Sequence, residues 1–462
     1  MKKCIVLLAL AAIYSCGKVE EFTDMETEGE MIEEPFANMS SLDQELLTAI
    51  NIASDGAGVS FFVLPAETDL ASIPQDPKNP LTAEKVALGK LLVHETATGG
   101  APKTVSTKFT YACATCHPVA SGFYAGARQG ISEGGIGFGF AGEGRRVDPS
   151  VPLDSVDILP IKVPSLLNVA YQEVMLWNGA LGGTGINTPY INTGTNATDL
   201  PDNLLGFEGL EVQGMAGQDV HRLKIDEEFA EEFGYTAMFD AAFPDVPEAD
   251  RYSRLTGALA IAAFNRTVLA TQAPWQSWLK GDMSAMSEQE KRGAIVFMNN
   301  GKCVNCHTGP SLKSNEFHAF GMGDLIGNGA IILDRRGFRK DVTRGRGAFT
   351  NREEDNFKFK VPNLYNLADN PFYGHGGTLT SIQDVVAYKN NGNKQNDRVP
   401  NDRLAEEFGN IDLNQEEIED LTAFLTVALR DPNLERYVPE EVLSGFCFPA
   451  NDAQAKEELG CD

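Results

Sequence analysis

The chain carries the pentapeptide Cys-x-x-Cys-His twice, at residues 113–117 and 303–307. This motif attaches c-type haem, because its two thiols add to the haem vinyl groups and the adjacent histidine becomes an axial ligand of the iron. A zinc site or a redox-active cysteine pair is the alternative, but two complete copies that both end in histidine disfavour it. The sequence therefore predicts two covalently bound c-type haems. The expected attachment cysteines and proximal iron ligands are Cys113, Cys116, His117, Cys303, Cys306 and His307.

The N-terminus is typical of an exported protein. A short basic start precedes an apolar run that is too short to span a bilayer, so we expect residues 1–15 to be a signal peptide. The residues around Cys16 resemble a bacterial lipoprotein box, which makes Cys16 the lipidated first residue; ordinary cleavage nearby is the alternative. Residues 16–40 are acidic and poor in apolar side chains, so we expect a flexible tether. The predicted location is the cell envelope, periplasm-facing or at the surface, with the lipid as the only membrane contact.

The remaining cysteines predict a disulfide near the C-terminus. Of the eight cysteines, four lie in the haem motifs, Cys4 lies in the signal peptide and Cys16 in the lipoprotein box. Cys447 and Cys461 are left, and they flank a short polar stretch in the tail, residues 441–462. Because the compartment is oxidising, we expect them to pair, with a local stabilising effect.

Length and charge exclude one class of partner. The formal net charge is −27, whereas a nucleic-acid binder needs basic patches to neutralise phosphates. The acidity is suited to steering a basic electron-donor protein, and a solvated, soluble surface is the alternative. The 462 residues are enough for two or three domains with cores of their own.

Hydrophobic periodicity predicts a mainly α-helical chain. We expect helices over residues 41–53, from an N-cap at Thr82, and over 252–270, with further helices opening at capping boxes that begin at Ser287 and Asn414. A stretch with seven glycines among seventeen residues, 130–146, is expected to be an irregular loop.

The order of these elements repeats along the chain. In each half a helix leads into a haem motif, and a long loop then leads to a later helix. The economical interpretation is two cytochrome c-type helical domains, residues 41–283 and 284–440, each binding one covalent haem.

Several spaced motifs resemble those of bacterial di-haem cytochrome c peroxidases and the related di-haem oxidases. The resemblance covers roughly residues 80 to 430 and follows the order of that family. The matching segments are residues 164–169, 177–179, 278–282, 289–293, 361–366 and 375–377. The resemblance implies a peroxide-reactive haem in the N-terminal domain and an electron-receiving haem in the C-terminal domain. It also implies a tryptophan that acts as an electron bridge between them, and Trp177 matches that position.

The resemblance also suggests which residues face the reactive haem. Peroxide cleavage needs a nearby group that moves a proton between the two peroxide oxygens. Gln213 matches a family glutamine, and His221 falls about where the family has a glutamate; a purely structural histidine is the alternative. Many relatives block this iron with a histidine until the second haem is reduced. Phe138 stands at that place here, so we expect an open site, the alternative being that His221 or Met215 closes it.

Two further positions depart from the family pattern. The sixth ligand of the second haem is usually Met, or Tyr in oxidases that modify a partner's tryptophans. Lys389 aligns there with Tyr388 beside it, and Met322 is a second candidate ligand. Many relatives hold calcium between the domains through an asparagine. Lys162 takes that position and Asp369 falls near another ligand, so we expect a Lys162–Asp369 pair in place of calcium.

The sequence says less about the roles of the three other histidines. We expect His94 on the surface at a helix end and His318 near the second haem, without a defined role. His375 matches a family position near that haem, and a structural hydrogen bond and a redox role remain open for it.

The motifs and the resemblance together predict an oxidoreductase of the cytochrome-c peroxidase type. It would reduce hydrogen peroxide to water with electrons from a small redox protein, a cytochrome c or a cupredoxin. The alternatives are a di-haem oxidase that modifies a partner protein or another substrate, and a non-enzymatic electron-transfer cytochrome. The resemblance leaves a homodimer open.

Overall fold

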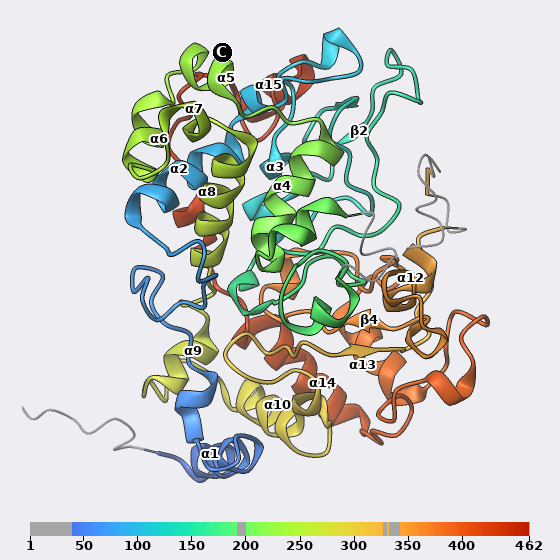
Figure 1. Ribbon diagram of the computed structural model, residues 1–462. Coiled ribbons are helices and arrows are strands. Elements are labelled where there is room, and N and C mark those ends of the chain that lie inside the picture. The colour runs from blue at the N-terminus through green and yellow to red at the C-terminus, as the bar shows by residue number, and fades with distance from the viewer. Residues whose placement is uncertain (1–38, 192–199, 327–329, 332–341, 462) are drawn as a thin grey trace, which may run out of the picture.

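The structure is a computed structural model that describes residues 39–191, 200–326, 330–331 and 342–461 (Figure 1). The expected signal peptide, the lipidated Cys16 and nearly all of the tether lie outside the described residues. The described chain is mainly helical, as predicted, and its strands are two residues long. Among the described residues, no helix combines the length and the apolar character that crossing a bilayer requires.

The first half is built around three helices, α2 (Ala83–His94), α4 (Gly209–His221) and α8 (Arg254–Thr267). Helix α8 is buried along almost its whole length and packs against both of the others. It approaches α2 so closely that a Cβ on Gly89 would lie 1.9 Å from the Ala260 carbonyl oxygen. The predicted N-cap at Thr82 is confirmed, since its side chain accepts a hydrogen bond from the Lys85 amide.

The second half repeats this arrangement with α10 (Glu288–Met298), α13 (Ile382–Asn391) and α14 (Gln415–Ala423), which continues as a π-helix over Phe424–Ala428. A Cβ on Gly293 would lie 2.0 Å from the Asp420 carbonyl oxygen, so α10 and α14 meet as α2 and α8 do.

The helix starts in this half follow the expected capping residues. The Asn414 capping box is confirmed. Ser287 accepts from the Glu290 amide as predicted, but the Glu290 carboxylate accepts from the Ser287 hydroxyl rather than from its amide.

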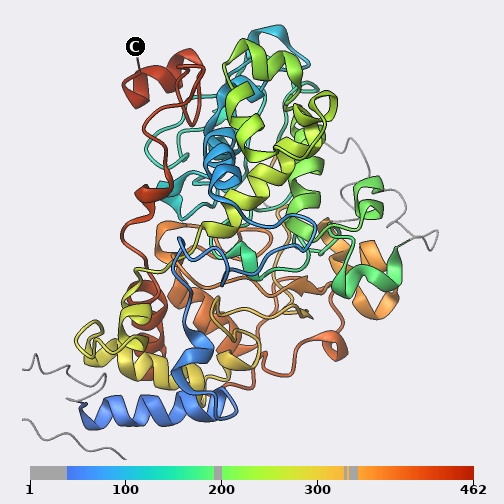
Figure 2. The same ribbon diagram turned by 60° about the vertical axis from the view of Figure 1, so that its left-hand side comes forward.

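The two ends of the chain each pack on the half that is distant in sequence. Helix α1 (Ser41–Ala53) lies beside α10 at one end of the molecule, and α15 (Ala453–Leu459) lies at the opposite end (Figures 1 and 2). Asp43 of α1 pairs with Lys291 at 2.7 Å and accepts from Trp278 Nε1 at 2.9 Å. The predicted Cys447–Cys461 disulfide is present in the tail. The tail packs on the first half, where Asp452 pairs with Arg145 at 2.7 Å.

The remaining regular elements are short and connect the larger helices. The short helices are α3 (Cys113–Cys116), α5 (Glu227–Glu232), α6 (Thr236–Ala242), α7 (Glu248–Arg251), α9 (Pro274–Leu279) and α12 (Arg346–Thr350). Two antiparallel pairs join β1 (Gly135–Ile136) to β2 (Arg146–Val147), and β3 (Phe317–His318) to β4 (Phe359–Lys360). The first pair corrects the expectation that residues 130–146 contain no regular element, since the loop folds back on itself.

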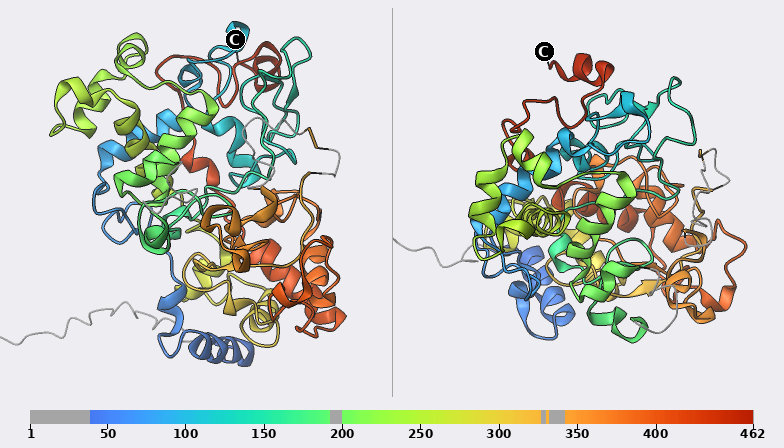
Figure 3. Two further views of the ribbon diagram at one scale, coloured as in Figure 1. Left: turned by 45° about the vertical axis from the view of Figure 1, so that its right-hand side comes forward. Right: turned by 45° about the horizontal axis from the view of Figure 1, so that its top comes forward.

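The two halves share one apolar core. A continuous buried cluster runs from α1 and α2 through α8, α9 and α10 to α14. Trp275 and Trp278 of α9 stack at 5.7 Å within it. In the left view of Figure 3, the yellow and orange segments of the second half lie below the green segments of the first half. The division into domains 41–283 and 284–440 stays a prediction.

Candidate haem sites

The first Cys-x-x-Cys-His motif lies at an apolar cavity between α3 and α4. Cys113, Cys116 and His117 all line this cavity. His117 Nδ1 donates to the Phe123 carbonyl oxygen at 2.9 Å, which fixes the ring and leaves Nε2 to bind a metal. Burial lowers the pKa of His117 to about 4, so the imidazole is neutral, as an iron ligand must be.

Helix α4 brings Gln213 and His221 to the same cavity. The pair that the resemblance indicated therefore lies close to His117 and the two thiols. His221 Nδ1 lies 2.6 Å from Asp157 Oδ2, an ion pair from a loop that sequence reasoning did not identify. Met215, the other residue considered as a ligand, is fully buried in the packing between α4 and α8 and does not line the cavity.

Phe138 does not face this cavity. Its ring packs against Ala450 and Ala455 of the C-terminal tail, and it is 2% exposed. The expectation that Phe138 occupies the place of a distal histidine is therefore wrong in space, because the tail draws its side chain away. Gln213 and His221 are among the residues that line the cavity, and Phe138 is not.

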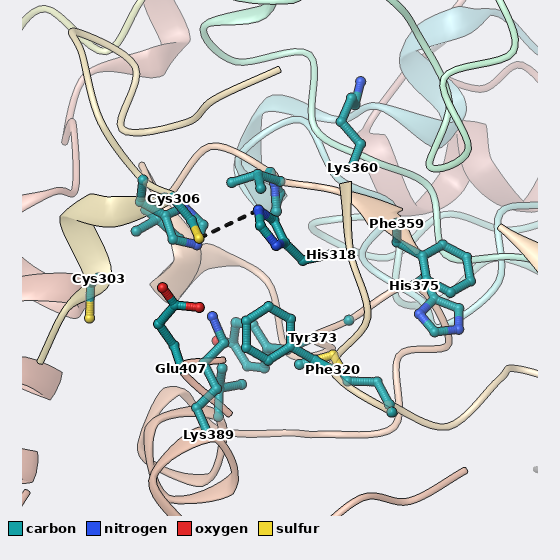
Figure 4. Close-up of a pocket in the computed structure, with 18 of the residues that line it drawn as sticks. Cys303, Cys306, His318, Phe320, Phe359, Lys360, Tyr373, His375, Lys389 and Glu407 are labelled. Atoms are coloured by element: carbon teal, nitrogen blue, oxygen red, sulfur yellow. Dashed lines mark hydrogen bonds between the residues drawn. The ribbon is translucent and has the colours of Figure 1, made fainter. Parts of the chain in front are cut away.

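The second motif lies at a larger cavity in the other half (Figure 4). Cys303, Cys306 and His307 line it. His307 Nδ1 donates to the Leu312 carbonyl oxygen at 3.1 Å, and burial lowers the pKa of His307 to about 3. His318 also lines the cavity, with Nε2 3.6 Å from Cys306 Sγ, as expected from its place in the sequence.

Both candidate sixth ligands reach the second cavity. Lys389 and Met322 line it, and Lys389 Nζ lies 4.8 Å from the centre of the Phe320 ring. The Tyr388 hydroxyl instead donates to the Phe320 carbonyl oxygen at 2.8 Å and does not line the cavity. The candidates at this haem therefore remain Lys389 and Met322.

The four motif cysteines fit haem attachment better than the alternatives. All four are free thiols, and burial raises the pKa of Cys116 to about 12 and of Cys303 to about 11. Burial therefore keeps these thiols protonated, whereas redox-active cysteines need easily formed thiolates. In both motifs the short turn brings two thiols and a neutral histidine to one apolar cavity, which is the donor set of a c-type haem.

Trp177 lies at the second cavity and is not among the residues that line the first. Its Nε1 donates to the Lys162 carbonyl oxygen at 2.7 Å. His375 lies 6.4 Å from the Trp177 ring and stacks on Phe359 at 3.7 Å (Figure 4). His375 Nε2 is also 3.1 Å from Asp324 Oδ1, so this histidine has the structural hydrogen bond that was one of its two interpretations.

Lys162 does not pair with Asp369, contrary to expectation. Asp369 binds Arg430 at 2.7 Å. Lys162 Nζ instead donates to the carbonyl oxygens of Ala125 at 2.6 Å and Ala127 at 3.3 Å. Because its side chain turns into the loop that follows the first motif, burial lowers the pKa of Lys162 to about 7.

His94 is buried rather than on the surface. It is 4% exposed, its Nδ1 donates to the Lys90 carbonyl oxygen at 2.8 Å, and burial lowers its pKa to about 4. The rings of Phe264 and Phe448 pack on it. The prediction failed because the C-terminal tail, which is remote in sequence, covers this end of α2.

Comparison with known proteins agrees with this arrangement. The family model of the di-haem cytochrome c peroxidases matches residues 83–284, which include the first motif, Trp177, Gln213 and His221. The methylamine utilization protein MauG of Methylorubrum extorquens is 28% identical over 362 residues, 78% of this chain and 82% of that protein. The cytochrome-c peroxidase IdrP1 of Denitromonas iodatirespirans is 28% identical over 391 residues, 81% of this chain and 88% of the relative.

The similarity extends to a third relative and to a solved structure. The cytochrome c peroxidase Ccp of Escherichia coli is 26% identical over 356 residues, 76% of this chain and 59% of that longer protein. A solved MauG-like protein associated with microbial copper homeostasis has the same fold, with a TM-score of 0.53, 22% identity, and coverage of 80% of this chain and 95% of that one. Residues 83–284 thus match the family model of the di-haem cytochrome c peroxidases, and most of the chain is similar to proteins named peroxidases and MauG.

Proposed function

We propose that this protein is a di-haem cytochrome c peroxidase of the cell envelope, anchored by lipid at Cys16. It converts hydrogen peroxide, two electrons and two protons into two molecules of water. The observation that carries the proposal is the meeting of Gln213 and His221 with His117 and the motif thiols at one cavity. Peroxide needs a proton acceptor and donor beside the iron, and these side chains are suited to that task.

Each motif would hold one covalent haem, in two cytochrome c-type domains. Cys113, Cys116 and His117 attach the first, and Cys303, Cys306 and His307 attach the second. When bound, the haems supply the iron that accepts and delivers electrons. Gln213 orients peroxide by hydrogen bonding, and His221 moves its proton. Trp177 links the two sites, since it lines the second cavity and its indole bonds to Lys162, whose ammonium is held by the loop after the first motif.

The electron donor would be a small redox protein, a cytochrome c or a cupredoxin, that delivers electrons to the second haem. The acidic charge of the chain suits a basic donor. A homodimer is one candidate assembly.

The test is peroxide consumption by the purified di-haem protein with several reduced cytochromes and cupredoxins. We expect two donor molecules to be oxidised per peroxide, and a high-spin ferric band in the resting optical spectrum. Peroxide consumption that is no faster than with haem-free protein contradicts the proposal. Two low-spin haems without turnover would indicate an electron-transfer cytochrome instead.

A second candidate is oxidation of a partner protein on the same scaffold. It is favoured by the half-exposed position of Trp177, whose oxidisable indole lines the second cavity. The relatives named MauG match this chain as well as the relatives named peroxidases do. Peroxide-dependent oxidation of a partner protein without consumption of reduced donor would favour this alternative.

A further inference from the structure

We propose that Asp157 is a positioning residue for His221, and that Asp157, Ser132 and His221 form a relay that aims the free imidazole nitrogen into the first cavity. The inference rests on the proposed function and names the group that sets the basicity and orientation of its proton carrier. Neither Asp157 nor Ser132 is adjacent to His221 in the chain.

The three side chains form a continuous hydrogen-bonded set. His221 Nδ1 lies 2.6 Å from Asp157 Oδ2, and the Ser132 hydroxyl donates to the same carboxylate oxygen. Ser132 and His221 both line the cavity, whereas Asp157 stands behind them with its side chain 13% exposed. Asp157 therefore acts through its neighbours and does not itself face the cavity.

The backbone holds Asp157 in place. The Ser132 amide donates to the Asp157 carbonyl oxygen at 3.0 Å, and the Asp157 amide donates to the Glu133 carbonyl oxygen at 2.8 Å. An isolated antiparallel bridge joins Ile131 to Ile158 beside them. These backbone hydrogen bonds between two loops fix the main chain at Asp157 and so limit where its carboxylate can lie.

His221 is held from its own side as well. It is the last residue of α4, and Arg222 follows in the left-handed conformation at φ 57°. The Arg222 guanidinium binds the buried carboxylate of Glu133, the neighbour of Ser132. Glu133 thus restrains Arg222 directly, and Ser132 restrains His221 through Asp157, which limits rotation of the imidazole.

The hydrogen bond selects the tautomer that can accept a proton from peroxide. A carboxylate only accepts, so Nδ1 carries the hydrogen and Nε2 keeps its lone pair. Burial alone would raise the pKa of Asp157, but its hydrogen bonds with His221 and Ser132 and the charge of Arg222 outweigh it, and the pKa lies below its ordinary value. Within the described residues, no hydrogen-bond partner of Nε2 is found, so it is available to the cavity.

Other charged and titratable groups surround this set. Glu133 and Arg145 face it from the loops, and Arg222 faces it from the turn that follows α4. His117 and Tyr111 lie on the side of the haem motif. All of these groups contribute to the pH dependence of the site. The test therefore changes one residue at a time and keeps the others as in the wild type.

The proton movement balances without any added reactant. Nε2 takes the proton of one peroxide oxygen and returns it to the other as the O–O bond breaks, so a water molecule leaves and His221 ends unchanged. Two electrons from the donor and two protons from solvent convert the second oxygen to water. The Asp157 carboxylate stabilises the transient imidazolium and is not itself protonated.

The test uses Asp157→Asn in the di-haem protein, with Asp154→Asn as the matched control. Asp154 lies in the same loop, carries the same charge and is exposed, and it does not contact His221. Asn can donate to Nδ1, which moves the imidazole hydrogen to Nε2 and removes the proton acceptor. We expect the first phase of peroxide decay to slow by about 10- to 100-fold in Asp157→Asn, whereas Asp154→Asn should match the wild type.

Cyanide association gives a readout that is independent of turnover. Hydrogen cyanide must lose its proton to a base when it binds ferric iron, so the pH profile of the association rate reports the distal base. We expect Asp157→Asn to lower the apparent pKa in this profile by about one unit or more. Asp157→Glu should restore part of the rate, and Asp157→Asn should add little to the defect of His221→Ala.

The outcomes separate this inference from the proposed function. An unchanged cyanide profile and peroxide phase in Asp157→Asn, in a wild type that reduces peroxide, overturn the inference alone. A shifted cyanide profile in a protein that does not turn over peroxide supports the relay and overturns the peroxidase. Where Asp157→Asn fails to retain haem, Ser132→Ala carries the test: a smaller shift in the same direction supports the relay, and no shift overturns it.

Discussion

Arg145 and Asp452, 307 residues apart in the chain, form an ion pair of 2.7 Å that ties the glycine-rich loop to the C-terminal tail. The same guanidinium donates to the Ser132 carbonyl oxygen at 2.8 Å, next to the relay behind the first cavity. Glu458 accepts from the amides of Phe138 and Gly139 at 2.6 and 2.8 Å. The tail, closed by its disulfide, therefore holds the glycine-rich loop at three of its residues.

Removing the disulfide should loosen this loop. In the double variant Cys447→Ser, Cys461→Ser we expect faster amide hydrogen exchange over residues 130–146 and a loss of at most about 3 kcal/mol of stability, given the 14-residue separation. Asp452→Asn, which keeps the disulfide, should raise exchange in the same loop, and Asp154→Asn should not. Unchanged hydrogen exchange in both tail variants would contradict the inference that the tail holds the loop.

Both haems should be covalent. Pyridine haemochrome analysis and intact mass of protein matured with the full cytochrome c machinery should give two haems per chain. His117→Ala should retain more attached haem than Cys113→Ala, because the thiols form the bonds. It should nevertheless lose peroxide reactivity, since the neutral imidazole held by Phe123 is removed. A single haem per chain refutes the prediction.

The enzyme should be active without prior reduction. The cavity at the first motif is lined by Gln213 and His221, and the loop residue Phe138 is turned into the tail. Fully oxidised protein should show one high-spin ferric signal in electron paramagnetic resonance and bind cyanide promptly. His221→Ala should keep that signal while peroxide cleavage slows by roughly a hundredfold. Two low-spin signals that give way to a high-spin one only on half-reduction would show a gate.

Calcium should not be required. The Lys162 ammonium is already bound to two loop carbonyls and repels a divalent cation. Elemental analysis of protein purified without chelator should find less than one calcium per chain, and a chelator should not change the melting temperature. Lys162→Asn frees the carbonyls, so calcium should stabilise that variant, whereas the surface variant Lys108→Asn should behave as the wild type. One tight, activity-supporting calcium in the wild type would be decisive against this.

Stability should depend on pH through Lys162. Burial lowers its pKa to about 7 in the folded protein, against about 10.4 in an unfolded chain. Between these values the unfolded chain binds more protons, so the contribution of Lys162 to stability rises with pH, by at most about 1.4 kcal/mol per unit. Below about pH 7 the penalty of burying the ammonium is fully present. In melting curves from pH 6 to 9, the stability of the wild type should rise relative to that of Lys162→Met as the pH rises. A difference in stability that does not change with pH would contradict the lowered pKa of Lys162.

Features encoded by neighbouring residues could be predicted from the sequence alone. Two cysteines and a histidine within one pentapeptide meet on a single turn wherever the chain folds, so the site of each haem needs no tertiary information. The caps at Thr82 and Asn414 act within one helical turn. The Cys447–Cys461 disulfide followed from counting, because the other cysteines already had local assignments. The family resemblance indicated Gln213 and His221, and both line the cavity at the first motif.

The remaining features depended on which distant segments meet, and only the tertiary structure decided them. Asp157 binds His221, which is 64 residues away in the sequence, because two loops pair beside it. No hydrophobic periodicity in the sequence predicts that pairing. The tail covers His94 and draws Phe138 away from the first cavity, whereas Lys162 binds loop carbonyls instead of Asp369. A glycine-rich loop has no local preference strong enough to fix its path, so its side chains take their places from the long-range contacts that the whole fold provides.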